Sequence, residues 1–168
     1  MKESLFTCTF QQSEKLLREY HYYVKSRGVR TWLWLGILLF AGSIAMYIFT
    51  RELLDLLLLL LGVYFGYTEL TKPAKNANKQ WGETLAKHKG EIPETTVTID
   101  EEKAVSITGD VEITLHFEDV LGLYFCKTCV VLQGFQEDIL ITNESVEDME
   151  AFKKFLDEQC QNAPVYRR

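Results

Sequence analysis

The chain has 168 residues, a formal net charge of −6 and a mean hydropathy of −0.06. This length allows one folded domain with additional segments, and the acidic balance argues against nucleic acid as a partner. The average hydropathy conceals a strong segregation, because Arg51, Glu52 and Asp55 are the only charged residues between Trp32 and Tyr67.

Residues 1–31 are predicted to form a cytoplasmic strand followed by an interfacial helix. Apolar and polar residues alternate from Ser4 to Phe10, which predicts a strand. Ser13 is a suitable N-cap for the helix that follows. Basic residues accompany its apolar stripe, as is typical of a helix near anionic lipid headgroups. The stripe comprises Leu16, Leu17, Tyr20 and Val24.

Residues 32–70 are predicted to form a transmembrane hairpin with spans at 32–49 and 53–70. The first span has 18 residues without a charge, which as a helix would be about 27 Å long. The second contains Asp55, whose insertion costs at most about 2.5–3.5 kcal/mol and is offset by the neighbouring leucines. A single buried helix of such length would be too long for a soluble domain of this size.

Asp55 has two interpretations. An ionisable residue inside a membrane span is a functional-site candidate by default. Because Asp55 lies at the start of its span, it can instead reach the interface or pair with Arg51 in the turn. We favour the turn.

Aromatic and basic residues mark the predicted ends and orientation of the hairpin. Aromatic rings favour the membrane–water interface, and Lys and Arg favour the cytoplasmic side. Basic residues flank both outer ends, so both termini are predicted to be cytoplasmic. The predicted membrane-interface residues are Trp32, Trp34, Tyr64, Tyr67, Lys72, Lys75 and Lys79.

Residues 71–90 are predicted to be a basic juxtamembrane linker. The linker is either simply solvated or attracted to anionic lipid through its lysines. A helix from Asn76 to Lys89 is a further option within it.

Residues 91–168 are predicted to form an acidic cytoplasmic β-rich domain. Short strands follow one another, and the run from Val111 to Phe117 alternates most clearly. The final segment predicts an amphipathic helix capped by Ser145. We therefore expect a six-stranded antiparallel meander closed by a C-terminal helix, within a membrane protein of the α+β class. Whether the N-terminal strand joins this sheet is left open.

The sequence "CKTC" from Cys126 to Cys129 has the spacing of a redox or metal pair. Redox pairs of this kind begin a helix, whereas this pair flanks a two-residue turn between predicted strands. No second pair or His cluster completes a metal site. We favour structural cysteines and expect no metal, no cofactor and no catalysis, with a thiol oxidoreductase as an alternative.

The order of elements resembles the YcxB-like membrane proteins of bacteria. The resemblance lies in the stretches "ITLHFEDVLGLYF", "DILIT" and "MEAFKKFLDEQ", where Phe117, Asp119 and Val120 match the family's rhythm. It implies an architecture in the bacterial inner membrane and no particular chemistry. A meander with a C-terminal helix also looks like pleckstrin-homology-type domains, as an analogy of fold.

These features predict a small multi-pass membrane protein with a cytoplasmic binding or regulatory domain. Its expected partners are the lipid bilayer and an unidentified protein, and self-association into a homo-oligomer is left open. An alternative is an immunity protein that protects its producer's membrane from a toxin, because an acidic domain held at the membrane would suit a basic partner.

Overall fold

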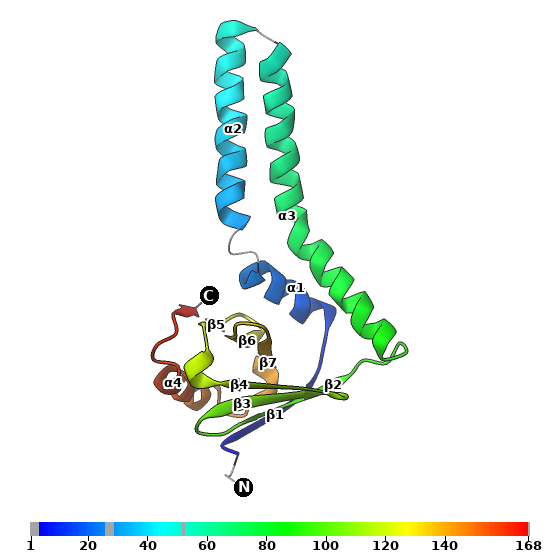
Figure 1. Ribbon diagram of the computed structural model, residues 1–168, viewed down its shortest axis with the longest axis vertical. Helices are drawn as coiled ribbons and strands as arrows, with labels where there is room; N and C mark the ends of the chain where they lie inside the picture. The colour runs from blue at the N-terminus through cyan, green and yellow to red at the C-terminus, as the bar shows by residue number, and fades with distance from the viewer. Residues whose placement is uncertain (1–3, 26–28, 52, 168) are drawn as a thin grey trace.

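The computed structural model describes the backbone of residues 4–25, 29–51 and 53–167, and their side chains except those of residues 29–32 and 53–56. Two helices, α2 (Val29–Thr50) and α3 (Leu53–Lys87), project as an antiparallel pair from a β-rich body, and α1 (Glu14–Tyr23) lies between the pair and the body (Figure 1). The chain is thus a mixed α+β protein with antiparallel sheets, as predicted.

The first sheet is fully antiparallel and has the order β1-β2-β3-β4. Its strands are β1 (Phe6–Gln11), β2 (Glu94–Ile99), β3 (Lys103–Thr108) and β4 (Val111–His116). Cys8 faces Val97 in the register of β1 against β2. The N-terminal strand therefore joins the sheet, and residues 12–93 are inserted between two strands that are neighbours in space.

The second sheet has the order β7-β6-β5-β8. Its strands are β5 (Gly122–Phe125), β6 (Cys129–Gln133), β7 (Asp138–Thr142) and β8 (Val165–Arg167), with β8 parallel to β5. The prediction of a single six-stranded meander was therefore wrong. A 3-10 turn, η2 (Phe117–Asp119), ends β4 and starts a new sheet, and the short β8 was not anticipated.

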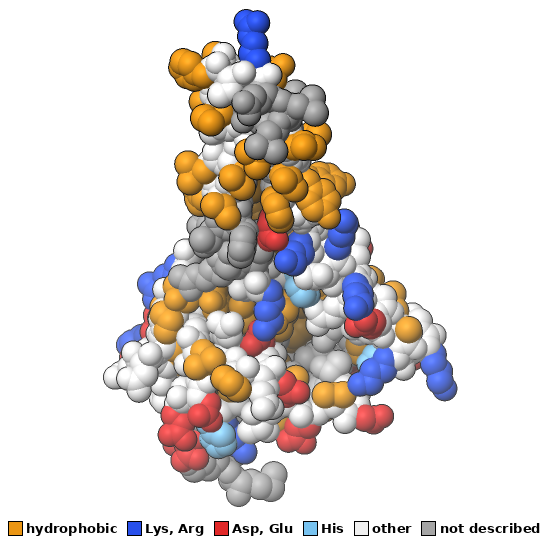
Figure 2. Space-filling view, turned by 45° about the horizontal axis from the view of Figure 1, so that its top comes forward, with side chains coloured by type: hydrophobic (Ala, Val, Ile, Leu, Met, Phe, Trp, Pro, Cys, Tyr) orange, Lys and Arg blue, Asp and Glu red, His pale blue; other side chains and the backbone are white. Residues whose placement is uncertain are grey.

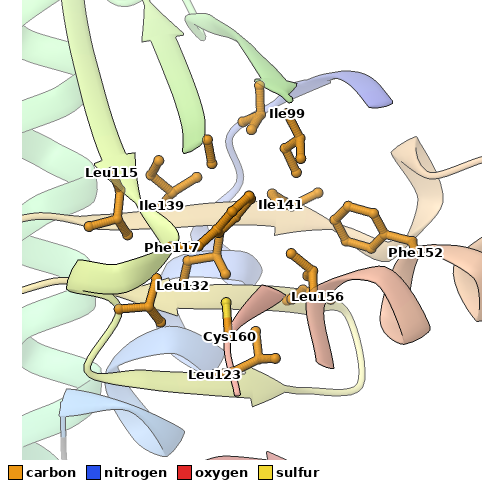
Figure 3. Close-up of a cluster of buried hydrophobic side chains, with 14 of the residues drawn as sticks. Ile99, Leu115, Phe117, Leu123, Leu132, Ile139, Ile141, Phe152, Leu156 and Cys160 are labelled. Carbon is orange, nitrogen blue, oxygen red and sulfur yellow. The ribbon is translucent and has the colours of Figure 1, made fainter. Parts of the chain in front are cut away.

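The main core lies between the two sheets and α4 (Met149–Gln159), which closes one end of the sandwich (Figure 3). Phe152 and Leu156 of α4 are fully buried there, which confirms the predicted apolar stripe. The predicted cap was wrong, because Asp148 accepts the N–H groups of Glu150 and Ala151 at 3.1 and 3.0 Å. Ser145 instead belongs to a 3-10 turn, η3 (Asn143–Ser145).

A second, smaller core lies between α1 and the outer face of the second sheet. Strands β5 and β6 are therefore covered on both faces, and nearly all their residues are buried. The predicted cap of α1 is confirmed, since Ser13 accepts the N–H of Leu16 at 3.2 Å. The buried residues of this cluster are Leu16, Tyr20, Val24, Tyr124, Cys126, Cys129 and Val131.

Helices α2 and α3 pack closely through small residues. A Cβ at Gly62 would lie 3.2 Å from the backbone nitrogen of Phe40 and 3.3 Å from the carbonyl oxygen of Gly36. Glycine thus permits an approach that a larger side chain would prevent. Helices α2 and α3 therefore form a helical hairpin, and this packing does not depend on whether a membrane surrounds it.

Residues 71–90 were predicted to be a linker. The structure instead continues α3 without a break through residues 71–87, ending at Lys87. Figure 1 shows α3 changing direction on its way to the β-rich body. Pro73 lies inside the helix and accounts for a bend, because proline removes one backbone hydrogen bond and its ring crowds the preceding turn.

Among the described residues, one helix is long and apolar enough to cross a membrane, namely α2 over Leu33–Thr50. Most of this segment is exposed in the isolated chain. Helix α3 does not meet the same criterion in its described part, so the test does not support two spans. The crossing of a membrane by α3 stays a prediction.

Candidate functional site

Helix α1 joins the helical hairpin to the β sandwich. On one side its apolar residues pack against the second sheet. On the other side His21 shares a hydrogen bond of 2.6 Å with the side-chain oxygen of Gln80 on α3. Helix α1 thus contacts both parts of the molecule, which makes this junction a candidate site for communication between them.

A buried carboxylate holds the C-terminal end of α1. Asp138 begins β7, and its side chain is only 2% exposed. One of its oxygens accepts the hydroxyl of Tyr20 at 2.6 Å and lies 2.8 Å from the ammonium of Lys25. Burial raises the pKa of Tyr20, and the hydrogen bond to Asp138 and its negative charge raise it further. Tyr20 therefore remains a hydrogen-bond donor at neutral pH.

A second carboxylate attaches the middle of α1 to the β5–β6 turn. Glu19 accepts the backbone N–H groups of Lys127 and Thr128 at 2.7 and 3.3 Å, as well as the Thr128 hydroxyl. From the other side, the amide nitrogen of Asn143 donates to the carbonyl oxygens of Cys126 and Lys127 at 3.2 and 2.9 Å. Side chains from α1 and η3 thus fix both faces of this turn.

The two cysteines of "CKTC" flank that turn, as the sequence predicts. The N–H of Cys126 donates to the carbonyl oxygen of Cys129 at 2.8 Å, and both thiols are buried and not joined in a disulfide. The pKa of Cys129 is raised, first by a hydrogen bond with Cys126, then by burial and by the nearby charge of Glu19. A protonated, buried thiol is a poor nucleophile, so Cys129 is not suited to attack at neutral pH. The oxidoreductase alternative stays a prediction.

The predicted membrane-interface aromatics lie on the projecting hairpin. In the isolated chain, 62–63% of the surface of Trp34, Tyr64 and Tyr67 is exposed. Figure 2 shows hydrophobic side chains on the projecting end and charged side chains gathered mainly over the body. The side chains of Trp32 and Asp55 lie outside the described residues. The interfacial roles stay predictions.

The three predicted basic residues follow the apolar part of α3 and are exposed. The ammonium of Lys72 lies 3.4 Å from the carboxylate of Glu69, and that of Lys79 lies 3.8 Å from Glu83. Lys75 is also exposed. The Lys79–Glu83 pair is exposed on both sides and contributes little to stability. Glu69 is largely buried, but the Lys72 side chain itself is mostly exposed, so all three lysines remain accessible to other anions.

A groove lies between α4 and the C-terminal ends of β5 and β8. It encloses about 440 Å³, within the usual range for a small-ligand site. Within the described part of the chain, no group of three His, Cys, Asp or Glu side chains could hold a metal ion.

Sequence reasoning missed most of the polar contacts at the junction. Tyr20 was identified as part of the apolar stripe, but Glu19, Asp138 and Asn143 were not identified at all. Each of them contacts residues far away in the chain, and a single sequence carries no local signal for such pairs.

Comparisons of the chain with protein-family models, with curated proteins and with solved structures found no match.

Proposed function

We propose that this chain is a membrane-anchored protein whose β sandwich is a binding or regulatory domain without catalytic activity. The observation that carries the proposal is the apolar hairpin inserted between two paired strands of an otherwise acidic, folded body. If the hairpin is an anchor, such an insertion would hold the sandwich beside it through two chain connections.

Two spans are part of this proposal. Helix α2 meets the length and hydropathy criterion, and the close packing at Gly62 keeps the apolar part of α3 beside it. A membrane around α2 would therefore also surround that part of α3. The Lys and Arg bias of the flanks supports cytoplasmic termini, and the resemblance to YcxB-like proteins supports the bacterial inner membrane.

The expected partner is a protein. The sandwich of two sheets closed by α4 supports the analogy with pleckstrin-homology-type domains, many of which bind lipids or proteins. An acidic surface repels anionic lipid, which favours a protein partner for the sandwich and leaves lipid contact to the hairpin and its lysines. An immunity protein remains an alternative within the same architecture, and a neighbouring gene for a secreted toxin would favour it.

Topology tests the proposal directly. A cysteine in place of Thr50 should react with a membrane-impermeant maleimide in intact cells, and a reporter fused after Arg168 should be active only in the cytoplasm. The matched control is Thr114→Cys, on the exposed β4, which should react only after the cells are opened. The four native cysteines are buried and should give little background.

Reaction of Thr114→Cys in intact cells, or protection of Thr50→Cys, would reverse the orientation. Extraction of the protein from membranes at alkaline pH would contradict the anchor itself.

A cross-linking experiment tests the binding function. A cross-linker attached at an exposed position of the sandwich, such as 114, should recover a specific partner protein from intact membranes.

A further inference from the structure

The groove between α4 and the edge of the second sheet has a defined construction. One face of α4 supplies residues spaced as i, i+3, i+4 and i+7, which line a single side of a helix. The buried residues Phe125 and Val130 also line it. The full lining is Phe125, Cys126, Val130, Asn143, Glu150, Lys153, Lys154, Asp157 and Arg167.

Positive charge concentrates at this groove within an acidic domain. Residues 91–168 contain six Lys and Arg against 17 Asp and Glu. Three of those six, Lys153, Lys154 and Arg167, line this one cavity. Within residues 91–168, a ligand with negative charge would meet more cations here than elsewhere.

The lining also limits the charge of that ligand. Glu150 and Asp157 lie among the three cations, so the lining has a formal charge of only +1. Each cation already lies near a carboxylate. Lys153 is 3.2 Å from Glu150, and Arg167 pairs with Asp157. Lys154 is 3.9 Å from Glu158, which lies outside the lining. A phosphate dianion would be repelled by the two carboxylates, whereas a monoanion matches the net charge.

Two acceptor oxygens of the lining have no hydrogen-bond partner among the described residues. They are Oδ1 of Asn143 and Oδ1 of Asp157, and both are buried. Buried acceptors without a donor are uncommon and cost free energy. Lys154 and Arg167 are long and mostly exposed, so they can move aside and admit a ligand with N–H groups.

We propose that this groove binds the carboxyl terminus of a partner polypeptide. Lys153 and Lys154 pair with the terminal carboxylate, and Asn143 and Asp157 accept backbone N–H groups next to it. A peptide end combines one negative charge with adjacent N–H donors, as the lining requires. The inference rests on the proposed protein-binding function and names the part of the partner that the sandwich recognises.

The test uses the full chain in detergent micelles and beads that carry a pentapeptide pool randomised at its last three positions. One set of beads presents free carboxylates and the other presents the same pool as C-terminal amides. The carboxylate beads should retain the protein about tenfold better, as expected for two partly exposed ion pairs plus hydrogen bonds. Added NaCl should reduce that difference because salt screens exposed charges.

The double variant Lys153→Gln/Lys154→Gln should lose the preference for carboxylate beads, while Lys103→Gln on β3 is the matched control and should keep it. Unchanged thermal unfolding would show that both variants fold. Equal retention on the two kinds of beads, no retention on either, or equally strong competition by inorganic phosphate would overturn the inference. A protein cross-linked from position 114 in membranes would, in that event, leave the proposed binding function intact.

Discussion

The substitution Asp138→Ala should release the C-terminal end of α1 from the second sheet. It removes the acceptor of the Tyr20 hydroxyl and the partner of the Lys25 ammonium. It also removes the acceptor of the Gly134 N–H, which lies 3.3 Å from the other carboxylate oxygen. Because Tyr20 is 6% exposed, its hydroxyl would be left buried without a partner. We therefore expect Asp138→Ala to lower the free energy of unfolding more than most substitutions at the start of a strand would.

The magnitude follows mainly from the contacts with Tyr20 and Lys25, because the Gly134 hydrogen bond is long at 3.3 Å. A buried hydrogen bond to a carboxylate is worth about 1.5–3 kcal/mol, and the ion pair with the half-exposed Lys25 adds about 0–1 kcal/mol after screening. A loss of 2 kcal/mol would lower the unfolding temperature of a sandwich of this size by roughly 8–16 °C. Thermal unfolding of the full chain in micelles, followed by near-ultraviolet circular dichroism, measures it.

Two companion variants make the test specific. Asp138→Asn keeps an acceptor for Tyr20 and should cost less than Asp138→Ala. Tyr20→Phe should cost about 1–2 kcal/mol alone and much less in the Asp138→Ala background, because the two residues share one interaction. Additive losses in the double variant, or a change below about 0.5 kcal/mol in Asp138→Ala, would refute this account of the junction.

Three further predictions concern other parts of the chain. Gly62→Leu should separate α2 from α3 because its side chain meets the backbone of Phe40, and cross-linking between cysteines on the two helices should fall, whereas unchanged cross-linking would contradict the close approach. Cys129→Ser should leave the fold and cellular phenotype intact; a lost phenotype with a normal melting curve would revive thiol chemistry. Burial, and then the charge of Asp157, raises the pKa of Cys160 from 9.0 to about 11, so its contribution to stability is complete below pH 9 and is lost as the pH rises toward 11. Cys160→Ala should therefore reduce the alkaline fall in unfolding temperature without abolishing it, because Tyr20 and Cys129 also have raised pKa values. An equally steep fall would show that Cys160 does not contribute.

Local patterns in the sequence were sufficient for elements whose signals lie within a few residues. The cap at Ser13, the stripe that buries Phe152 and Leu156, and the turn after Cys126 all depend on neighbouring residues, and all three are confirmed. The two apolar helices also followed from composition, although the membrane around them is still a prediction.

Features that depend on distant parts of the chain could not be predicted in this way. Strand β8 has only three residues and forms because β5 offers it an edge. Asp148 caps α4 in place of the predicted Ser145, because Ser145 lies in the 3-10 turn η3. There its hydroxyl donates to the Thr142 carbonyl oxygen at 2.8 Å. The contacts of Glu19 with the β5–β6 turn join residues more than one hundred positions apart, and no local pattern encodes them.

The insertion of residues 12–93 between β1 and β2 sets an order of events during biosynthesis. At about 5–20 residues per second, a ribosome needs roughly 4–16 seconds to synthesise this segment. For that time β1 has left the ribosome before its partner strand exists, and its apolar side chains at Phe6, Cys8 and Phe10 have no sheet to cover them. The sandwich can therefore be completed only after the hairpin has been made, so any slowing of synthesis across residues 12–93 would prolong the exposure of an unpaired, aggregation-prone strand.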